Sequence, residues 1–94
     1  MIRSFKSKET EKVWHGKRSA KLPLEVQKVG RRKLRMLNNS IDINDLRIPP
    51  SNRLEKLSGK FAGFYSIRVN DQWRIIFKWL EGHSFDVQII NYHK

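Results

Sequence analysis

The feature that most constrains the fold of this 94-residue chain is a change in the spacing of its apolar residues near Asn52. Before Asn52, apolar side chains such as Val26, Leu34 and Leu37 recur at helical intervals and fall on one face. After Asn52, apolar and polar residues alternate, which is typical of strands. Helices therefore come first along the chain, and strands follow.

The expected elements form one α+β domain over residues 1–94. Helices are predicted over Ser7–His15 and Pro23–Asn39, with one further helical turn over Ile43–Leu46. Strands are predicted over Arg53–Leu57, Phe64–Val69, Trp73–Leu80 and Phe85–Tyr92, with an edge strand over Ile2–Phe5 and extended chain at Pro49-Pro50. Short connections between strands require antiparallel neighbours. The predicted fold is two N-terminal helices packed on a twisted, mainly antiparallel sheet of four to five strands.

The alternation also predicts how the strands pair, because the two apolar rows of a hairpin must share one face. A three-residue loop over 70–72 places Ile67 opposite Ile75 and Arg68 opposite Arg74. In the next hairpin, Trp79, Phe77 and Ile75 are expected opposite Phe85, Val87 and Ile89. Two arginines in direct opposition destabilise a strand pair unless an anion, a carboxylate or water surrounds them. The other face of the sheet is therefore expected to be cationic and to carry Ser66, Arg68, Arg74, Lys78, Gln88 and Tyr92.

Charge suggests the class of partner. The chain has 20 Lys and Arg against 9 Asp and Glu, a net charge of +11. Residues 1–36 hold 12 of these basic residues and 3 of the acidic ones, whereas residues 37–94 hold 8 and 6. This asymmetry favours a polyanion, with nucleic acid as the first candidate. A solvated basic face that keeps the protein soluble is the plainer alternative.

The residue content argues against several kinds of catalytic and metal site, and against a membrane span. The absence of cysteine removes thiol catalysis and zinc–thiolate sites. The three histidines lie far apart without clustered carboxylates, so we expect no metal and no cofactor. No apolar run approaches the roughly 18 residues of a membrane span, and the N-terminus lacks a signal-peptide core. A cytoplasmic protein is expected, with no membrane partner.

Metal-free cleavage of RNA remains possible. It needs a base for the 2′-hydroxyl, cations for the phosphorane and an acid for the 5′-oxygen. Glu55, the pair Arg68 and Arg74, and His93 supply these three parts. The plainer alternatives are that Glu55 pairs with a neighbouring cation and that His93 is merely solvated.

Three segments resemble the RelE/ParE toxin superfamily, most closely its HigB branch. They are the segment over 53–59, the block over 63–77 that reads G-F-Y-S-I-R-V-N-D-Q-W-R-I-I-F, and the closing Asn91-Tyr92-His93. The start, Met-Ile-Arg-Ser-Phe, adds to the resemblance, which spans essentially the whole chain. It implies a RelE-like fold and a toxin of a type II toxin–antitoxin pair that cuts translated mRNA in the ribosomal A site.

The resemblance also implies roles for single residues. Arg74 matches the phosphate-stabilising arginine, Glu55 a catalytic glutamate of the YoeB-type members and His93 a C-terminal histidine, with Tyr92 placed to stack on or orient a base. Arg68 joins this catalytic set from the strand register alone. RNA and ribosome contacts are expected from Lys6, Lys8, Lys28, Arg31, Arg32, Arg35, Arg53 and Lys56. The expected protein partner is a HigA-like antitoxin.

The sequence departs from better-known HigB members at three places. Those proteins have histidine where this chain has Glu55, lysine where it has Ser58, and an acidic residue near Asn91. Two other functions stay open at this point. One is a ParE-like inhibitor of DNA gyrase, and the other is a non-catalytic basic module that binds RNA or the ribosome.

Overall fold

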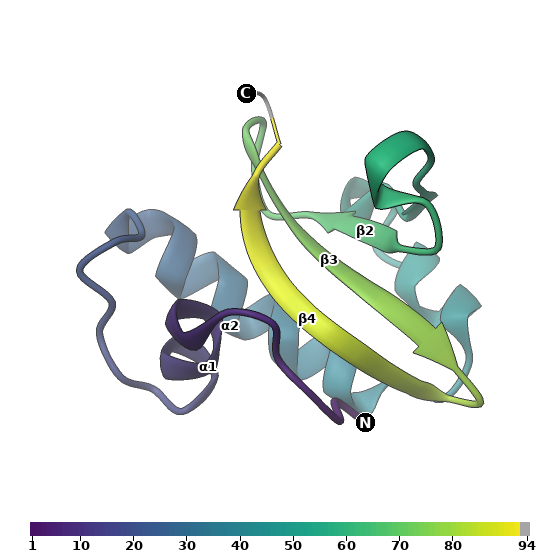
Figure 1. Cartoon of the computed structure of the whole chain (residues 1–94), viewed down its shortest axis with the longest axis horizontal. Coiled ribbons are helices and arrows are strands. Elements are labelled where there is room, and N and C mark those ends of the chain that lie inside the picture. The colour runs from purple at the N-terminus through teal and green to yellow at the C-terminus, as the bar shows by residue number, and fades with distance from the viewer. Residues whose placement is uncertain (93–94) are drawn as a thin grey trace.

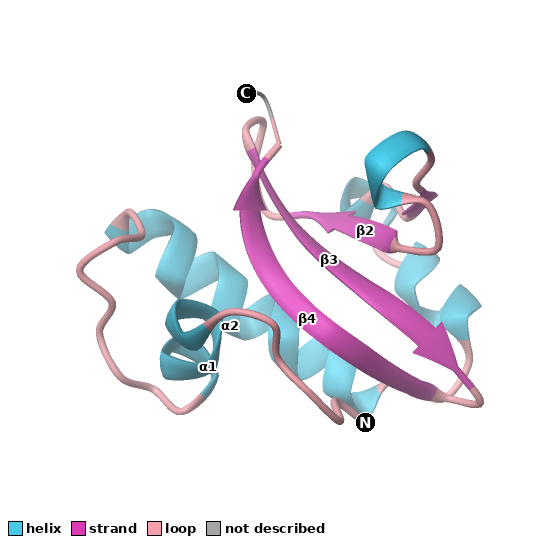
Figure 2. Cartoon of the chain, viewed as in Figure 1, coloured by secondary structure: helices cyan, strands magenta, loops and turns pink. Residues whose placement is uncertain are grey.

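A computed structural model describes residues 1–92 and shows two helices followed by a four-stranded antiparallel sheet, as predicted (Figures 1 and 2). The helices are α1 (Lys8–Trp14) and α2 (Leu24–Asn39), and the strands are β1 (Glu55–Lys56), β2 (Tyr65–Arg68), β3 (Trp73–Leu80) and β4 (His83–Asn91). Short 3₁₀ turns are η1 (Ile43–Arg47), η2 (Pro50–Asn52) and η3 (Gly59–Phe61). The strands lie in the order β1-β2-β3-β4, so each pairs with the next along the chain.

Helix α1 has well-defined ends. The Ser7 hydroxyl accepts the Thr10 N–H at its start, as an N-cap does. At its end, the Gly16 N–H donates to the Val13 carbonyl and the Lys17 N–H to the Lys12 carbonyl. This is a Schellman motif, which needs a left-handed residue that glycine adopts without strain. Gly16 has φ +76° and so fixes where the chain leaves α1.

Helix α2 lies behind the sheet in Figure 1 and covers one of its faces. Its buried side chains include Val26, Leu34 and Leu37, which confirms the predicted apolar face. A β-carbon at Gly30 would lie 3.1 Å from the Ile89 Cδ1 atom, so glycine lets α2 approach β4 closely. The main core fills this interface between α2, α1 and the sheet.

The β2–β3 hairpin has the predicted register. Ile67 pairs with Ile75 and Arg68 pairs with Arg74. The Asn70 side chain accepts the N–H groups of Gln72 and Trp73, which holds the three-residue loop. Because this register is fixed, the two arginines share one face of the sheet.

The β3–β4 hairpin matches the prediction at one end only. Ile75 pairs with Ile89 as expected, but Lys78, rather than Trp79, pairs with Phe85. The turn is a two-residue Glu81-Gly82 link with positive φ at both positions (51° and 81°), not the expected four-residue loop. That geometry is typical of a type I′ hairpin. A bulge beside Asp86, where φ is 53°, then restores the register toward the buried end.

Two short segments differ from their predicted form. Residues 2–5 run along the edge of β4 through two isolated parallel bridges, Ile2 with Ser84 and Phe5 with Val87, and form no continuous strand. Of the proline pair, Pro49 is extended as predicted, whereas Pro50 begins the turn η2, which ends at Arg53 in the left-handed region. The predicted strand at 53–57 is correspondingly short, with only Glu55 and Lys56 in β1.

The outer face of the sheet is only partly polar. A second apolar cluster of Leu57, Phe64 and Ile76 packs there, with Phe61 and Ile90 at its margin. Ile76 is therefore buried beneath the η3 segment and does not face solvent, although it lies on the predicted cationic face. No helix within residues 1–92 is long and apolar enough to cross a membrane.

Candidate functional site

Three neighbouring strands bring Glu55, Ser66 and Arg74 together on the outer face. Glu55 of β1 lies directly opposite Ser66 of β2, and Arg74 of β3 is the diagonal neighbour of Ser66. The Arg74 Nη1 atom lies 3.1 Å from the Glu55 Oε1 atom and donates to the Ser66 hydroxyl at 2.9 Å. The same nitrogen contacts the Arg53 carbonyl oxygen at 3.5 Å. The sheet thus presents a carboxylate and a guanidinium as one unit.

Exposure differs between the two members of this pair. The Arg74 side chain is 13% exposed, whereas that of Glu55 is 44% exposed. Arg74 is held at the sheet surface, and Glu55 is open to a ligand. Within residues 1–92, the polar contacts of Arg74 to Glu55, Ser66 and Arg53 all use Nη1. Its Nε and Nη2 atoms are therefore the donors best placed to bind an anion.

Tyr92 completes the described part of the site. Its ring centroid lies 5.1 Å from the Arg74 guanidinium carbon, a cation–π distance. Its backbone N–H donates to the Gln72 carbonyl at 2.6 Å, which ties the end of β4 to the β2–β3 loop. His93, the predicted acid, lies outside the described residues.

Arg68 has a different neighbour. It stands opposite Arg74 as predicted, but its guanidinium pairs with the Asp71 carboxylate in the adjacent loop. Each arginine of the facing pair therefore has its own acidic partner, which explains how the sheet tolerates two like charges in opposition. The structure brings Glu55, Arg74 and Tyr92 together and turns Arg68 toward the loop.

A hollow of about 470 Å³ adjoins Tyr92. Phe61, Ile90 and Tyr92 contribute apolar and aromatic walls, and Lys60 and Asn91 line the remainder. The site therefore combines charged groups with a partly apolar hollow beside them. No group of three or more His, Asp or Glu side chains suited to a metal lies within residues 1–92.

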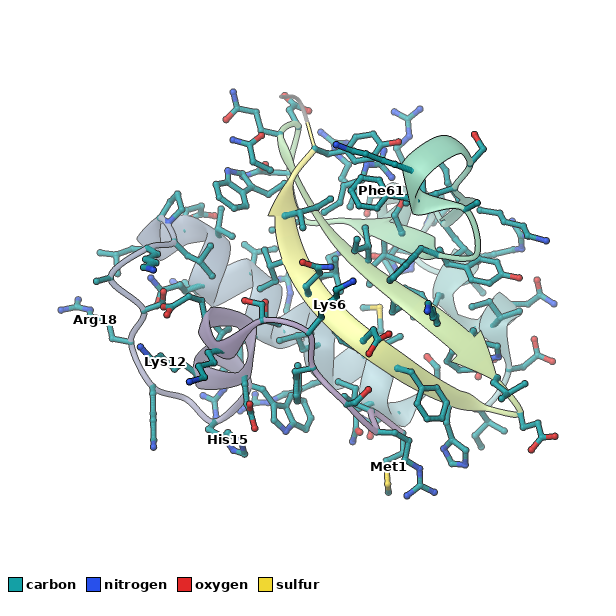
Figure 3. All side chains as sticks on the ribbon, viewed as in Figure 1. Met1, Lys6, Lys12, His15, Arg18 and Phe61 are labelled. Atoms are coloured by element: carbon teal, nitrogen blue, oxygen red, sulfur yellow. The ribbon has the colours of Figure 1, made fainter. Side chains whose placement is uncertain are left out.

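The predicted RNA-contacting residues do not form one patch. Lys28, Arg32 and Arg35 are exposed on α2, and Arg31 turns toward the end of α1. Lys6 instead lies over the Phe64 ring at 5.9 Å, on the outer face of the sheet (Figure 3). The other predicted contacts, Lys8, Arg53 and Lys56, are exposed at the start of α1 and around β1.

Sequence reasoning missed a buried lysine behind the site. Lys33 on α2 is 6% exposed and donates to the Asn52 side-chain oxygen, and Asn52 in turn donates to the Leu46 carbonyl. Burial, followed by the charges of Arg32 and Arg68, lowers the pKa of Lys33 below its ordinary value. The available signal was its position, because residue 33 falls on the same helical row as the apolar residues 26 and 37. Asn52 comes three residues before Glu55, so this contact anchors the chain that enters β1.

Solved structures share this fold. YafQ from E. coli strain BL21(DE3) matches with a TM-score of 0.64 at 14% identity, over 97% of this chain and 91% of that one. The YoeB–YefM complex from Staphylococcus aureus matches with a TM-score of 0.61 at 19% identity, over 100% and 99%. The fold is that of the RelE-like toxins, as predicted from the sequence.

Sequence comparison identifies the family. Residues 3–93 match the model of the RelE-like toxin of type II toxin-antitoxin system HigB, and the chain belongs to this family. Toxin HigB-1 of Vibrio cholerae is 42% identical over 90 residues, which cover 95% of each chain. Endoribonuclease HigB of Proteus vulgaris is 28% identical over 94 residues, or 99% of this chain and 100% of that relative. The predicted family is confirmed, and the name of the Proteus vulgaris relative agrees with the enzyme class predicted from the sequence.

Proposed function

We propose that this toxin is a ribosome-dependent endoribonuclease that inhibits translation by cutting mRNA without a metal ion. The observation that carries the proposal is the pair of Glu55 and Arg74 beside the Tyr92 ring. It joins a group that can accept a proton to a cation that can bind a phosphate. The name of the Proteus vulgaris relative, an endoribonuclease, supports the same activity.

In the proposed reaction the 2′-oxygen of a ribose attacks the adjacent phosphorus, and the bond from phosphorus to the 5′-oxygen breaks. Glu55 takes the proton of the 2′-hydroxyl, and Arg74 stabilises the negative charge that builds on the phosphate oxygens. An acid returns a proton to the leaving 5′-oxygen, and His93 is our candidate for it. The products are a 2′,3′-cyclic phosphate and a free 5′-hydroxyl.

Two contacts suit Arg74 to this role before substrate arrives. The Ser66 hydroxyl and the Arg53 carbonyl are neutral acceptors that orient Nη1 without cancelling its charge. Such preorganised donors stabilise a developing anion more than mobile ones do. Tyr92 offers a flat face on which a neighbouring base can stack.

Membership of a type II toxin–antitoxin family implies an antitoxin partner. We propose that this partner is HigA-like and that the substrate is mRNA in the ribosomal A site, with ribosomal RNA as the docking surface. The net charge of +11 supports a polyanionic partner of this kind. The expected compartment is the cytoplasm, where translating ribosomes are found.

The activity can be tested by primer extension on total RNA after induction of the toxin. The wild type should give new 5′ ends within translated messages. Arg74→Ala should lower cleavage by about 100-fold to 1000-fold, because a preorganised donor to the anion is lost. Glu55→Gln, which keeps the size of the side chain, should lower it by about 100-fold or more through loss of the base.

Arg47→Ala is the matched control, because Arg47 is an exposed arginine of η1 whose side chain makes one hydrogen bond, to Asn44, among the described residues. It should cleave as the wild type does. Cleavage by Arg74→Ala at the wild-type level would refute the proposed active site. Growth arrest without new 5′ ends, together with loss of gyrase supercoiling, would support the ParE-like alternative. Equal cleavage of purified mRNA with and without ribosomes would refute ribosome dependence but not the endoribonuclease activity.

A further inference from the structure

A second basic feature lies away from the proposed active site, in a cleft between α1 and α2. The cleft holds about 250 Å³, and its basic lining is Lys17, Arg18, Lys28 and Arg31. Figure 3 shows Arg18 on the loop that follows α1, on the side of the molecule away from the strands. Lys17 and Arg18 were not among the RNA contacts predicted from the sequence.

The Arg31 guanidinium is held in place by packing. A β-carbon at Gly16 would lie 3.0 Å from the Arg31 Nη2 atom and 3.2 Å from its Cζ atom. Glycine at this position therefore lets the guanidinium lie directly against the backbone at the end of α1. The Arg31 Nε atom is covered and has no hydrogen-bond acceptor within the described chain. The orientation thus arises from the shape of the cleft, without an acidic partner.

The loop that carries Lys17 and Arg18 is fastened to both helices through Ser19. The Gln27 side chain on α2 accepts the Ser19 N–H at 2.9 Å and donates to the Ser19 carbonyl at 2.8 Å. The Ser19 hydroxyl donates to the Glu9 carboxylate on α1. Ser19 is buried, so these bonds are shielded from water. The loop that carries Lys17 and Arg18 is therefore fastened to α2, which carries the other two cations of the cleft.

The cleft has no acidic residue in its lining, and none of its four cations forms an ion pair within residues 1–92. Elsewhere in that range, Arg68, Arg74 and Lys78 each have a carboxylate partner. Four like charges around one hollow repel each other, and a bound anion would relieve this repulsion. A planar guanidinium in a fixed position suits the oxygens of a phosphate.

We propose that this cleft is a phosphate site for the RNA backbone. The site rests on the proposed function for its ligand, because a toxin that cuts mRNA on the ribosome must hold RNA that it does not cut. Arg31 binds the phosphate with its fixed guanidinium, and Lys17, Arg18 and Lys28 surround it. Such contacts supply affinity and orientation but carry no sequence information.

Binding can be measured apart from cleavage with a fluorescein-labelled 20-nucleotide 2′-O-methyl RNA, which lacks the attacking hydroxyl. Fluorescence anisotropy at several salt concentrations gives the affinity and its salt dependence. Arg31→Gln should weaken binding by about fivefold to tenfold and flatten the plot of log affinity against log salt by about 0.7, the value for one lost phosphate contact on a single strand. Lys28→Gln should act in the same direction.

Arg47→Gln removes the same charge from η1, beyond the opposite end of α2, and should leave the slope unchanged. In a second measurement, inorganic phosphate should shift the amide NMR signals of Gly16 and Lys17 in the wild type and not in Arg31→Gln. Equal slopes for Arg31→Gln and the wild type would refute the RNA site, even if free phosphate binds. Loss of antitoxin binding with unchanged RNA binding would also refute it, since the cleft would then serve the protein partner.

The two proposals fail in different ways. If Arg74→Ala still cleaves, the proposed active site is wrong, whereas the binding of 2′-O-methyl RNA through Arg31 is measured without cleavage. In a ribosome-based assay Arg31→Gln should raise KM and leave kcat unchanged. A fall in kcat with constant KM would place Arg31 in the chemistry and would overturn a docking role.

Discussion

At the scale of single residues, Arg74 shows how several neighbouring groups position one side chain. Glu55, the Ser66 hydroxyl and the Arg53 carbonyl contact its Nη1 atom, and the Tyr92 ring lies beside its guanidinium. Only Glu55 carries a charge among these neighbours. Removal of a neutral neighbour should therefore change the orientation of Arg74 and leave its charge intact, which separates positioning from charge by experiment.

Ser66→Ala tests that separation. The variant loses a hydrogen bond to a charged group, worth about 1.5–3 kcal/mol where the geometry is good. If Arg74 needs this bond to face the phosphate, the cleavage rate should fall about tenfold or more. Ser66 is buried, so loss of the bond should also lower the thermal unfolding midpoint by several degrees, and cleavage is compared at a temperature where the variant remains folded. Cleavage at the wild-type rate by a folded Ser66→Ala protein would show that Glu55 and Arg53 suffice to position Arg74.

Lys33 gives a prediction for stability as a function of pH. Burial lowers its pKa in the folded protein, so between that pKa and the ordinary value of 10.5 the unfolded chain binds more protons than the folded one. The free energy of unfolding must then rise with pH across this window and level off above it. Lys33→Met should lack that rise.

Urea unfolding of both proteins between neutral pH and about pH 10.5 measures the difference, in which the titration of all other groups cancels. The gap in stability between wild type and Lys33→Met should shift in favour of the wild type as the pH rises. Parallel curves would show that Lys33 keeps an ordinary pKa. Lys33→Met also leaves the Asn52 oxygen without its donor, so a constant offset is expected in addition.

At the scale of elements, the β3–β4 hairpin shows why turn chemistry matters. Glu81 adopts φ 51° in the Glu81-Gly82 turn, and the first position of a type I′ turn favours asparagine. Glu81→Asn should therefore stabilise the fold by about 0.5–1 kcal/mol in denaturant unfolding. Glu81→Ala is the matched control, because alanine lacks the local hydrogen bonds that ease the left-handed region. An equal gain in both variants would point to removal of the charge as the cause.

The same hairpin marks the limit of what periodicity predicts. Alternation correctly paired Ile67 with Ile75 and Ile75 with Ile89, because burial of both apolar rows allows only that register. It did not predict the bulge beside Asp86. An extra residue in β4 shifts the local pairing with β3, while the alternation of the buried apolar residues toward Ile89 stays unchanged. The prediction failed at Trp79 for this reason.

The residues of the candidate site were likewise predictable only in part. The strand register predicted that Arg74 faces outward with Ser66, whereas Glu55 was proposed as a base for RNA cleavage and matched to a catalytic glutamate only by the family resemblance. Alternation located a strand over 53–57 but not its true length, because β1 has only two residues and follows a left-handed Arg53. The contact of Lys33 with Asn52, which anchors the approach to β1, joins side chains 19 residues apart, and such a tertiary contact does not follow from periodicity.

For the whole molecule, the basic residues serve different places. The excess of basic residues in residues 1–36 favoured a polyanionic partner, yet Lys33 is buried and Lys6 lies on the outer face of the sheet. The α1–α2 cleft collects only part of the charge, and the proposed active site contains Arg74 with its own carboxylate. Under the two proposals, docking and cleavage depend on different cations, and salt should affect them differently.

Salt dependence provides the last test. Counterion release weakens docking contacts as the salt concentration rises, whereas preorganised contacts at the scissile phosphate are shielded from salt. The cleavage rate should be measured at fixed, subsaturating ribosome concentration between about 50 and 200 mM salt. At the low end the defect of Arg31→Gln relative to the wild type should be largest, because the variant makes one phosphate contact fewer and gains less affinity as salt falls. At the high end both proteins should weaken. Arg74→Ala should stay nearly inactive throughout, because low salt restores association and not the stabilisation of the phosphorane. A defect in Arg31→Gln of equal size at every salt concentration would contradict the division between docking and cleavage.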